Sequence, residues 1–237
     1  TFIRFFKNHG LLTIKDHPQW YTVLGGSREY IRRLRERWAE TVEYKTGAVL
    51  VRRDNSKGVL VTDAAGQKHQ YDEVIFASHP DESLRMLQNA TSRENEILSA
   101  FRYQPNEVIL HTDASFMPRR RSAWASWIYQ SQKRKDDAPM ISLSYWMNNL
   151  QQLETTVPVI VTLNPIREPR PETVLDRHVF DHPVFEEGAI RAQDRLMDIQ
   201  GVDRIWYCGA WQRNGFHEDG LWSAVRIARK MGVDIPW

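Results

Sequence analysis

The sequence has little cysteine, no glycine-rich turn and no long apolar runs, and each shortage excludes a class of protein. Its single cysteine, Cys208, rules out an internal disulfide and a cysteine-rich metal site. No apolar run approaches the roughly 20 residues that a membrane-spanning helix needs. We see no charged-then-apolar secretory leader, so we expect a cytoplasmic location without a transmembrane segment. The 12 glycines include one adjacent pair, Gly25-Gly26, and no G-x-G-x-x-G turn.

The chain also has no large excess of positive or negative charge. The chain has 32 basic and 30 acidic residues, for a net charge of +2. Such a balance creates no strong field over the molecule, so we expect no nucleic-acid partner. With 41% hydrophobic and 11% aromatic residues, the 237-residue chain can fill a real core.

Two kinds of catalytic site lack their sequence patterns. Of the eight histidines, only His178 and His182 are spaced like metal ligands, and they lie in a predicted strand. We therefore expect no metal site. A serine hydrolase would need a nucleophile elbow such as G-x-S-x-G, which is absent. The catalytic residues stay unknown at this stage.

The hydrophobic periodicity predicts a mixed α+β chain. A helix after Ser27 is expected to bury Tyr30, Ile31, Leu34 and Trp38. Further helices are predicted from Pro80, from Thr91 and over 186–199. β-prone segments are predicted at 2–6, 11–14, 20–24, 42–44, 48–53, 59–62, 68–70, 72–77, 107–112, 123–129, 140–147, 157–163 and 174–180.

The end of the chain has the pattern of a ligand site. An apolar strand from Ile205 ends at Gly209, and a short loop leads through Gly215 into a helix. The apolar face of this helix is predicted to be buried and consists of Leu221, Ala224, Val225, Ala228 and Met231. The first turn of a helix offers unpaired N–H donors and a partial positive charge, which stabilise an electron-rich ligand edge.

These residues carry a resemblance to a known family. The runs 207–211 and 215–224 resemble the C-terminal flavin-binding segment of the amine oxidase and phytoene desaturase superfamily. The likeness extends to 25–28, 101–107 and 117–121, and thus over nearly the whole chain. Within the superfamily the chain is most similar to bacterial amine-oxidase-like NAD/FAD-binding proteins. They are akin to the flavin region fused to plant cyclopropane fatty acid synthases.

The resemblance implies an α/β flavoprotein fragment. Residues 1–101 and 185–237 would form part of an FAD-binding domain, and 102–184 a substrate domain whose antiparallel sheet covers the flavin. The superfamily binds the ADP part of FAD with an N-terminal Rossmann half, which this chain lacks. That half is therefore the expected partner. Alone, the chain is expected to hold FAD weakly or not at all and to be inactive.

The resemblance also implies the site residues. The positions matched to cofactor binding are Gly25, Gly26, Val49, Ala77, His79, Gly209, Ala210, Gly215, Phe216, His217, Glu218, Asp219, Gly220 and Leu221. The positions expected to face a small-molecule substrate are Tyr145, Trp146 and Phe216.

Departures from the family pattern bear on the substrate. Amine-oxidising members place a lysine on a substrate-domain strand, but no lysine lies between Arg102 and Arg119, and His111 is the nearest titratable base. Phe216 replaces a tyrosine of their aromatic cage, and Ala210 an acidic residue. We therefore predict an FAD-dependent oxidoreductase for an apolar or lipid-like substrate. The alternatives are an amine oxidase proper and a non-catalytic scaffold that binds a lipid or a partner protein.

Overall fold

A computed structural model describes residues 15, 19, 21–54, 57–132 and 140–237, which form two compact units. The first unit contains the residues up to Glu43 and Pro105–His182, and the second contains Tyr44–Gln104 and Pro183–Trp237. The chain thus leaves the second unit and returns to it. The predicted segments 2–6 and 11–14 lie outside the described residues. The described helices include none long and apolar enough to cross a bilayer.

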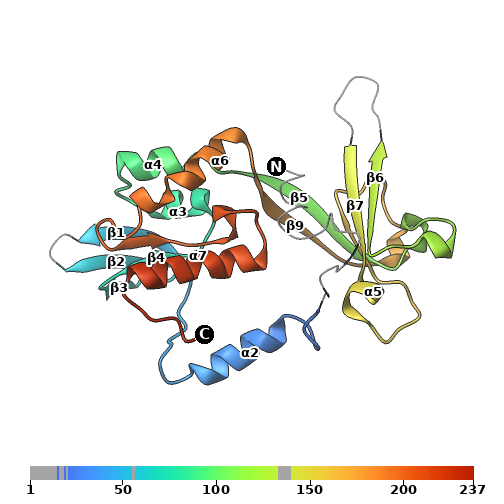
Figure 1. The fold of residues 1–237 in the computed structure, drawn as a ribbon, viewed down its shortest axis with the longest axis horizontal. Helices are drawn as coiled ribbons and strands as arrows, with labels where there is room; N and C mark the ends of the chain where they lie inside the picture. Colours follow the sequence, from blue (N-terminus) through green and yellow to red (C-terminus); the bar gives the residue numbers. More distant parts are fainter. Residues whose placement is uncertain (1–14, 16–18, 20, 55–56, 133–139) are drawn as a thin grey trace. The chain divides into compact units, whose positions relative to one another are not determined.

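The second unit combines an antiparallel meander, a short parallel pair of strands and surrounding helices (Figure 1). The meander is β1 (Ala48–Asp54), β2 (Gly58–Asp63) and β3 (Lys68–Tyr71), and the parallel pair is β4 (Val74–Phe76) and β10 (Ile205–Tyr207). The helices are α3 (Pro80–Met86), α4 (Ser92–Leu98), α6 (Glu187–Asp194) and α7 (His217–Lys230), with short 3₁₀ turns η4 (Leu196–Asp198) and η5 (Ala210–Gln212). Residues 42–44, predicted as a strand, form none.

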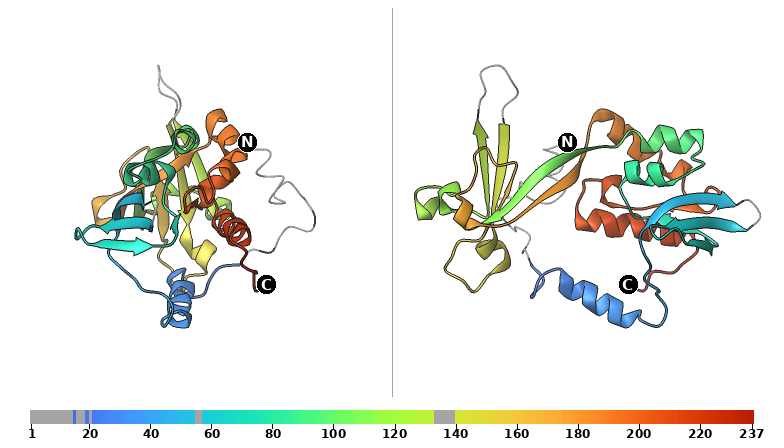
Figure 2. Two further views of the ribbon diagram at one scale, coloured as in Figure 1. Left: turned by 90° about the vertical axis from the view of Figure 1, so that its left-hand side faces the viewer. Right: turned by 180° about the vertical axis from the view of Figure 1, so that it is seen from behind.

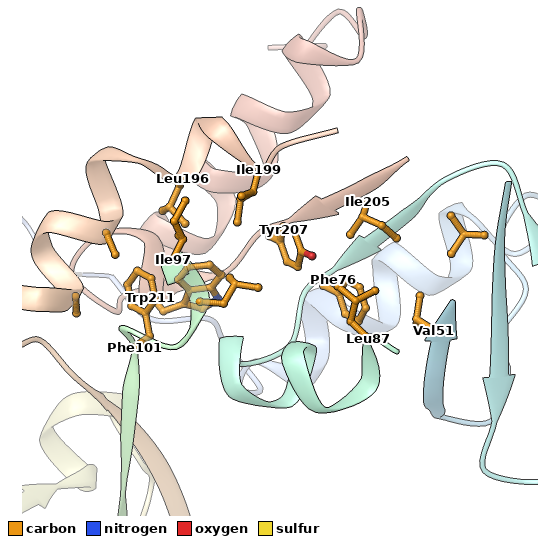
Figure 3. Packing of buried hydrophobic residues seen from close by; sticks show 14 residues of the cluster. Val51, Phe76, Leu87, Ile97, Phe101, Leu196, Ile199, Ile205, Tyr207 and Trp211 are labelled. Carbon is orange, nitrogen blue, oxygen red and sulfur yellow. The ribbon is translucent and has the colours of Figure 1, made fainter. Parts of the chain in front are cut away.

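One apolar core joins the early and late segments of this unit (Figure 3). Phe76 of β4 stacks on Tyr207 of β10 with ring centroids 5.5 Å apart, and Phe101 meets the edge of Trp211 at 4.7 Å. Figure 2 shows the helices α3, α4, α6 and α7 and the meander of this unit from two further sides. Since burial of apolar area is the main favourable term in folding, this core holds together segments that are a hundred residues apart in sequence.

The first unit is built on a five-stranded sheet in the order β6-β7-β8-β5-β9. Its strands are β5 (Arg102–His111), β6 (Trp127–Gln132), β7 (Met140–Trp146), β8 (Ile160–Leu163) and β9 (Val174–Val184), and its helices are α2 (Arg28–Arg37) and α5 (Met147–Gln151), with 3₁₀ turns η1 (Ala114–Phe116), η2 (Arg121–Ala123) and η3 (Pro171–Thr173). The pairs β5–β8, β6–β7 and β7–β8 are antiparallel. The coarse prediction of an α+β fold with an antiparallel sheet is confirmed.

The two faces of this sheet differ. Residues opposite each other on antiparallel strands share a face, and successive residues alternate between faces. One face is buried and carries Ile109, His111, Ser142, Ser144, Ile160 and Thr162. The other, which we call the open sheet face, carries the half-buried Val108, Leu110, Leu143, Tyr145, Val161 and Leu163 and the exposed Trp127, Tyr129 and Ile141.

The helix predicted after Ser27 forms, but its apolar face is not buried. Tyr30, Ile31, Leu34 and Trp38 are each 39–47% exposed, so the prediction that they are core residues is wrong. The periodicity identified side chains that share one face of a helix, and it contains no information on whether another element covers that face.

Candidate functional site

The carboxyl ends of the two parallel strands lie at the same edge of their sheet. Ala77, Ser78 and His79 follow β4, and Cys208 and Gly209 follow β10 in parallel register. Ligands of open parallel sheets bind outside the carboxyl ends of the strands. This edge is therefore the candidate site of the second unit.

A glycine turn connects β10 to the helix α7. Gly209 has a φ of +150°, and a Cβ there would lie 2.4 Å from Nε1 of Trp211, so no larger residue fits without displacing that ring. The N–H of Gly209 donates to Oγ of Ser223 at 2.9 Å, and this hydroxyl donates to the carbonyl of Gly220 at 2.7 Å. Ser223 thus fixes the first turns of α7 against the end of the strand.

A buried carboxylate holds the loop before α7. Asp219 accepts the N–H of Phe216 at 3.0 Å and the N–H of Asn214 at 3.2 Å. Within the described residues, the N–H groups of His217 and Glu218 have no protein acceptor, as expected for the first turn of a helix. The first turn therefore offers two donors to an electron-rich ligand, while the carboxylate of Asp219 is committed to shaping the loop.

His79 is held by its neighbours. Its ring stacks on Tyr103 with centroids 4.0 Å apart, and its backbone N–H donates to Oε2 of Glu82 at 3.2 Å. Burial, reinforced by the charges of Asp81 and Glu82, raises the pKa of Tyr103 above its ordinary range. Tyr103 is therefore neutral at physiological pH and serves as a platform for the His79 ring.

Most of the predicted cofactor positions belong to the second unit. Ala77, His79, Gly209, Ala210 and the segment 215–221 belong to the strand ends and the start of α7 in the second unit. Val49 lies in β1, at a register irregularity between Ala48 and Leu50, and is exposed. Gly25 and Gly26 belong to the first unit, in a turn with φ of +83° and +82°. Their cofactor roles stay predictions.

The buried side of α7 differs from the predicted one. Asp219, Ser223 and Ile227 are buried, whereas Leu221 and Met231 of the predicted buried face are exposed. The prediction is wrong because it assumed that the most hydrophobic face of the helix is the buried one. The hydrogen bonds of Asp219 and Ser223 to backbone groups compensate for burying polar side chains.

The two neighbouring substrate candidates lie on opposite faces of the sheet. Tyr145 belongs to the open sheet face, opposite Val161. Trp146 pairs with the buried Ile160, its ring meets the edge of Trp124 at 5.2 Å, and its indole N–H donates to Asn148 at 3.0 Å. Tyr145 and Trp146 therefore cannot both contact a ligand on the open sheet face.

His111 is placed where it cannot act on a substrate at that face. Its side chain is fully buried on the other face, with Nδ1 accepting the N–H of Asp113 at 3.2 Å. Nε2 therefore carries the proton and donates to Oγ1 of Thr162 at 2.8 Å. The same Oγ1 lies 2.8 Å from Oγ of Ser144. Burial lowers the pKa of His111. A neutral histidine in a buried hydrogen-bond chain supports the sheet.

Asp113, two residues after the end of β5, gives a pH-dependent prediction. Burial raises the pKa of Asp113, but hydrogen bonds from Ser115 and from the backbone N–H of Arg170 outweigh it and hold the value at about 2. A lowered folded-state pKa stabilises the fold above the unfolded value of about 4, and this contribution fades as the pH falls to about 2. We expect Asp113→Asn to lower the free energy of unfolding by about 1–2 kcal/mol at neutral pH.

Urea unfolding of the wild type and Asp113→Asn at a series of pH values measures this difference. It should stay constant down to about pH 5 and shrink between about pH 4 and pH 2, because Asp113 is then protonated in the unfolded chain but still ionised in the folded one. A difference that is the same at all pH values would contradict the role of the charge.

Sequence reasoning missed the side chains that brace the site. The family motif includes Ser223 without assigning it a role, and no sequence pattern points to Gln200 or Gln212. Both glutamines donate to the carbonyl of Tyr207, at 2.8 and 2.6 Å. A serine three residues after a glycine in a helix is a weak signal for a hydrogen bond that fixes the start of that helix. A glutamine in a loop gives no signal for its hydrogen bonds.

Comparison with known proteins identifies the fold. The sequence matches no family model and no curated protein. The structure is similar to a CLA-producing fatty acid isomerase from P. acnes, with a TM-score of 0.61 and 12% identity, over 88% of this chain and 52% of that chain. It is also similar to a reduced UDP-galactopyranose mutase, with a TM-score of 0.59 and 15% identity, over 88% and 52% of the two chains.

An oxidase shows the same likeness. Cyclohexylamine oxidase from Brevibacterium oxydans IH-35A matches with a TM-score of 0.56 and 10% identity, over 95% of this chain and 57% of that chain. At such identities the likeness establishes the fold alone. The chain spans about half the length of these proteins.

Proposed function

We propose that the chain is part of an FAD-dependent oxidoreductase that acts on an apolar substrate. The observation that carries the proposal is the glycine turn between β10 and α7, at the carboxyl ends of two parallel strands. The turn lies in a fold that is similar to those of an oxidase, an isomerase and a mutase. Its sequence also resembles a flavin-binding segment, and both likenesses support the proposal.

The residues present suit a flavin. The unpaired N–H groups of His217 and Glu218 and the positive end of α7 would bind an electron-rich ring edge. Ser223 and Asp219 would keep that helix end in place. A bound flavin would supply a two-electron acceptor for hydride. Because the fixed donors need no rearrangement, they would stabilise negative charge at the ring edge at little cost.

The open sheet face favours an apolar substrate. In the paired segments 108–111, 127–132, 140–146 and 160–163 it carries aliphatic and aromatic side chains, one serine, and no Asp, Glu, Lys, Arg or His. A cationic amine would be desolvated there without a compensating charge. A lipid-like chain would bury its methylene groups against such a surface.

A matched pair of glycine variants tests the flavin assignment. A Cβ at Gly220 would meet only the backbone N of Ala210, at 3.9 Å, and one at Gly188 in α6 would meet nothing within 4 Å. The fold therefore requires neither glycine, and alanine should stabilise either helix by up to about 1 kcal/mol. In the longer gene product we expect Gly220→Ala to weaken FAD binding at least about tenfold, whereas Gly188→Ala leaves it unchanged.

Flavin absorbance and FAD titration of the longer gene product provide the measurement. A colourless product that does not bind FAD would refute the proposal. If the longer gene product released hydrogen peroxide with polyamines but not with unsaturated lipids, its substrate would be an amine and not an apolar molecule.

A further inference from the structure

Four strands of the five-stranded sheet start or stop at one end of that sheet. β5 and β7 both end opposite Ile160, where β8 starts. β6 starts at Trp127, opposite Tyr145 near the end of β7. The connections 112–126 and 147–159 therefore lie at this end, and α5 in the second of them follows β7 directly (Figure 1).

Exposed arginines gather at this end, which we call the arginine end. Its members are Arg119, Arg120, Arg121 and Arg167. Arg167 belongs to the connection after β8 but reaches the arginine end, because its guanidinium donates to Oγ of Ser115 at 2.8 Å and lies 4.0 Å from the centre of the Phe116 ring. Within the described residues, none of the four arginines pairs with an acidic side chain.

The acidic residues of the same connections offset little of this positive charge. Asp113 is buried, and Glu168 and Glu172 pair with other arginines at 2.6 and 3.9 Å. Glu154 is exposed and adds one negative charge to the connection between α5 and β8. The arginine end is therefore positively charged, although the net charge of the whole chain is only +2.

Arg121 is held in place with its hydrogen-bond donors unused. Its guanidinium carbon lies 3.7 Å from the centre of the Trp124 ring and 4.7 Å from that of Trp146. The indole N–H of Trp124 is itself fixed, since it donates to the carbonyl of Pro118 at 2.8 Å. In the described part of the chain this guanidinium has no hydrogen-bond acceptor. A guanidinium stacked on an aromatic ring keeps its planar fork of donors, which matches the oxygens of a phosphate.

Exposed apolar side chains accompany the arginines. Trp127 is 45% exposed, and Val157, in the loop after α5, is 50% exposed. Hydrogen bonds fix both segments, since Nδ2 of Asn149 donates to Oγ of Ser126 at 2.6 Å and Nδ2 of Asn148 donates to the carbonyl of Val157 at 2.9 Å. Tryptophan and aliphatic side chains next to arginines suit the boundary between lipid head groups and water.

We propose that the arginine end docks the protein on a membrane surface that contains anionic phospholipids. Arg119, Arg120 and Arg121 bind lipid phosphates, while Trp127 and Val157 lie at the level of the head groups. Nucleic acid also presents phosphates, but it offers no apolar layer for exposed aliphatic side chains. Docking brings the protein to a source of lipids, although the surface itself does not depend on a flavin.

A charge-reversal variant tests this surface. Arg119→Glu/Arg120→Glu changes two exposed side chains that have no described partner, so we expect the melting temperature of the wild type. The matched control is Lys68→Glu/Arg229→Glu, which makes the same change in net charge at two exposed positions of the second unit. A milder variant, Arg119→Ala/Arg120→Ala, removes the charges without reversing them.

Binding is measured by sedimentation of the longer gene product, without FAD, with phosphatidylcholine vesicles that contain about 30% phosphatidylglycerol. We expect Arg119→Glu/Arg120→Glu to bind at least about tenfold more weakly than the wild type, and the alanine variant to lie between them. The control should stay within about twofold of the wild type, because salt screens distant charges. Raising the salt from about 0.1 M to about 0.5 M should weaken wild-type binding at least about tenfold.

Equal binding to vesicles with and without phosphatidylglycerol would overturn the inference, as would an equal loss in the control variant. Binding to a single-stranded oligonucleotide but not to the vesicles would assign the arginines to nucleic acid instead. Should the charge-reversal variant unfold, the alanine variant and the salt dependence of the wild type decide the question. Because FAD is absent, the outcome stands whether or not the longer gene product binds a flavin.

Discussion

Replacing Glu94 with alanine is expected to cost about 3–5 kcal/mol of stability, because it leaves a buried positive charge without its partner. Glu94 is fully buried in α4 and pairs with the guanidinium of Arg53. It also accepts the hydroxyl of Tyr207 at 2.6 Å and the N–H of Thr91 at 2.7 Å. The change therefore unpairs groups from β1, β10 and the start of α4 at once, and most of the stability of a typical domain would be lost.

Two further variants separate charge from packing. Glu94→Gln keeps the shape and an acceptor and should lose less than the alanine variant. Glu96→Ala removes an exposed carboxylate of the same helix that pairs with Arg195, and surface pairs contribute little because solvent screens them. Urea unfolding followed by tryptophan fluorescence gives the free energies. If Glu94→Ala and Glu96→Ala were equally stable, the buried network would not hold the unit together.

Replacing Gly209 with alanine is expected to destabilise the second unit by about 2–4 kcal/mol, the combined cost of backbone strain and overpacking. Gly209 has a positive φ, and the new Cβ would fall 2.4 Å from the indole of Trp211. That ring is buried and packs on Phe101, so it cannot move without opening the core. The displaced turn would also weaken the bond from the Gly209 N–H to Ser223.

The matched control is Gly66→Ala, at a turn of the meander. Its φ of +79° is also positive, but a Cβ there would meet nothing within 4 Å. Thermal unfolding should show a smaller loss for Gly66→Ala, of about 1 kcal/mol for strain alone. Equal losses at both positions would mean that the Trp211 clash is relieved by relaxation of the turn.

Local patterns predicted local structure well. The alternation in 107–112 and 140–147 and the period of α7 correspond to observed elements, because side-chain spacing is a property of a single strand or helix. The same patterns failed wherever burial depended on distant residues. The exposed face of α2 and the polar buried side of α7 are examples.

The sequence by itself determined the α+β class, the glycine turn before α7 and the absence of lysine from the strand at 107–112. Only the tertiary structure decided that His111 is buried away from the open sheet face and that Glu94 joins three elements. The reason is physical. Backbone preferences act between neighbours in sequence, whereas desolvation and strand pairing depend on residues that meet only after the chain has folded.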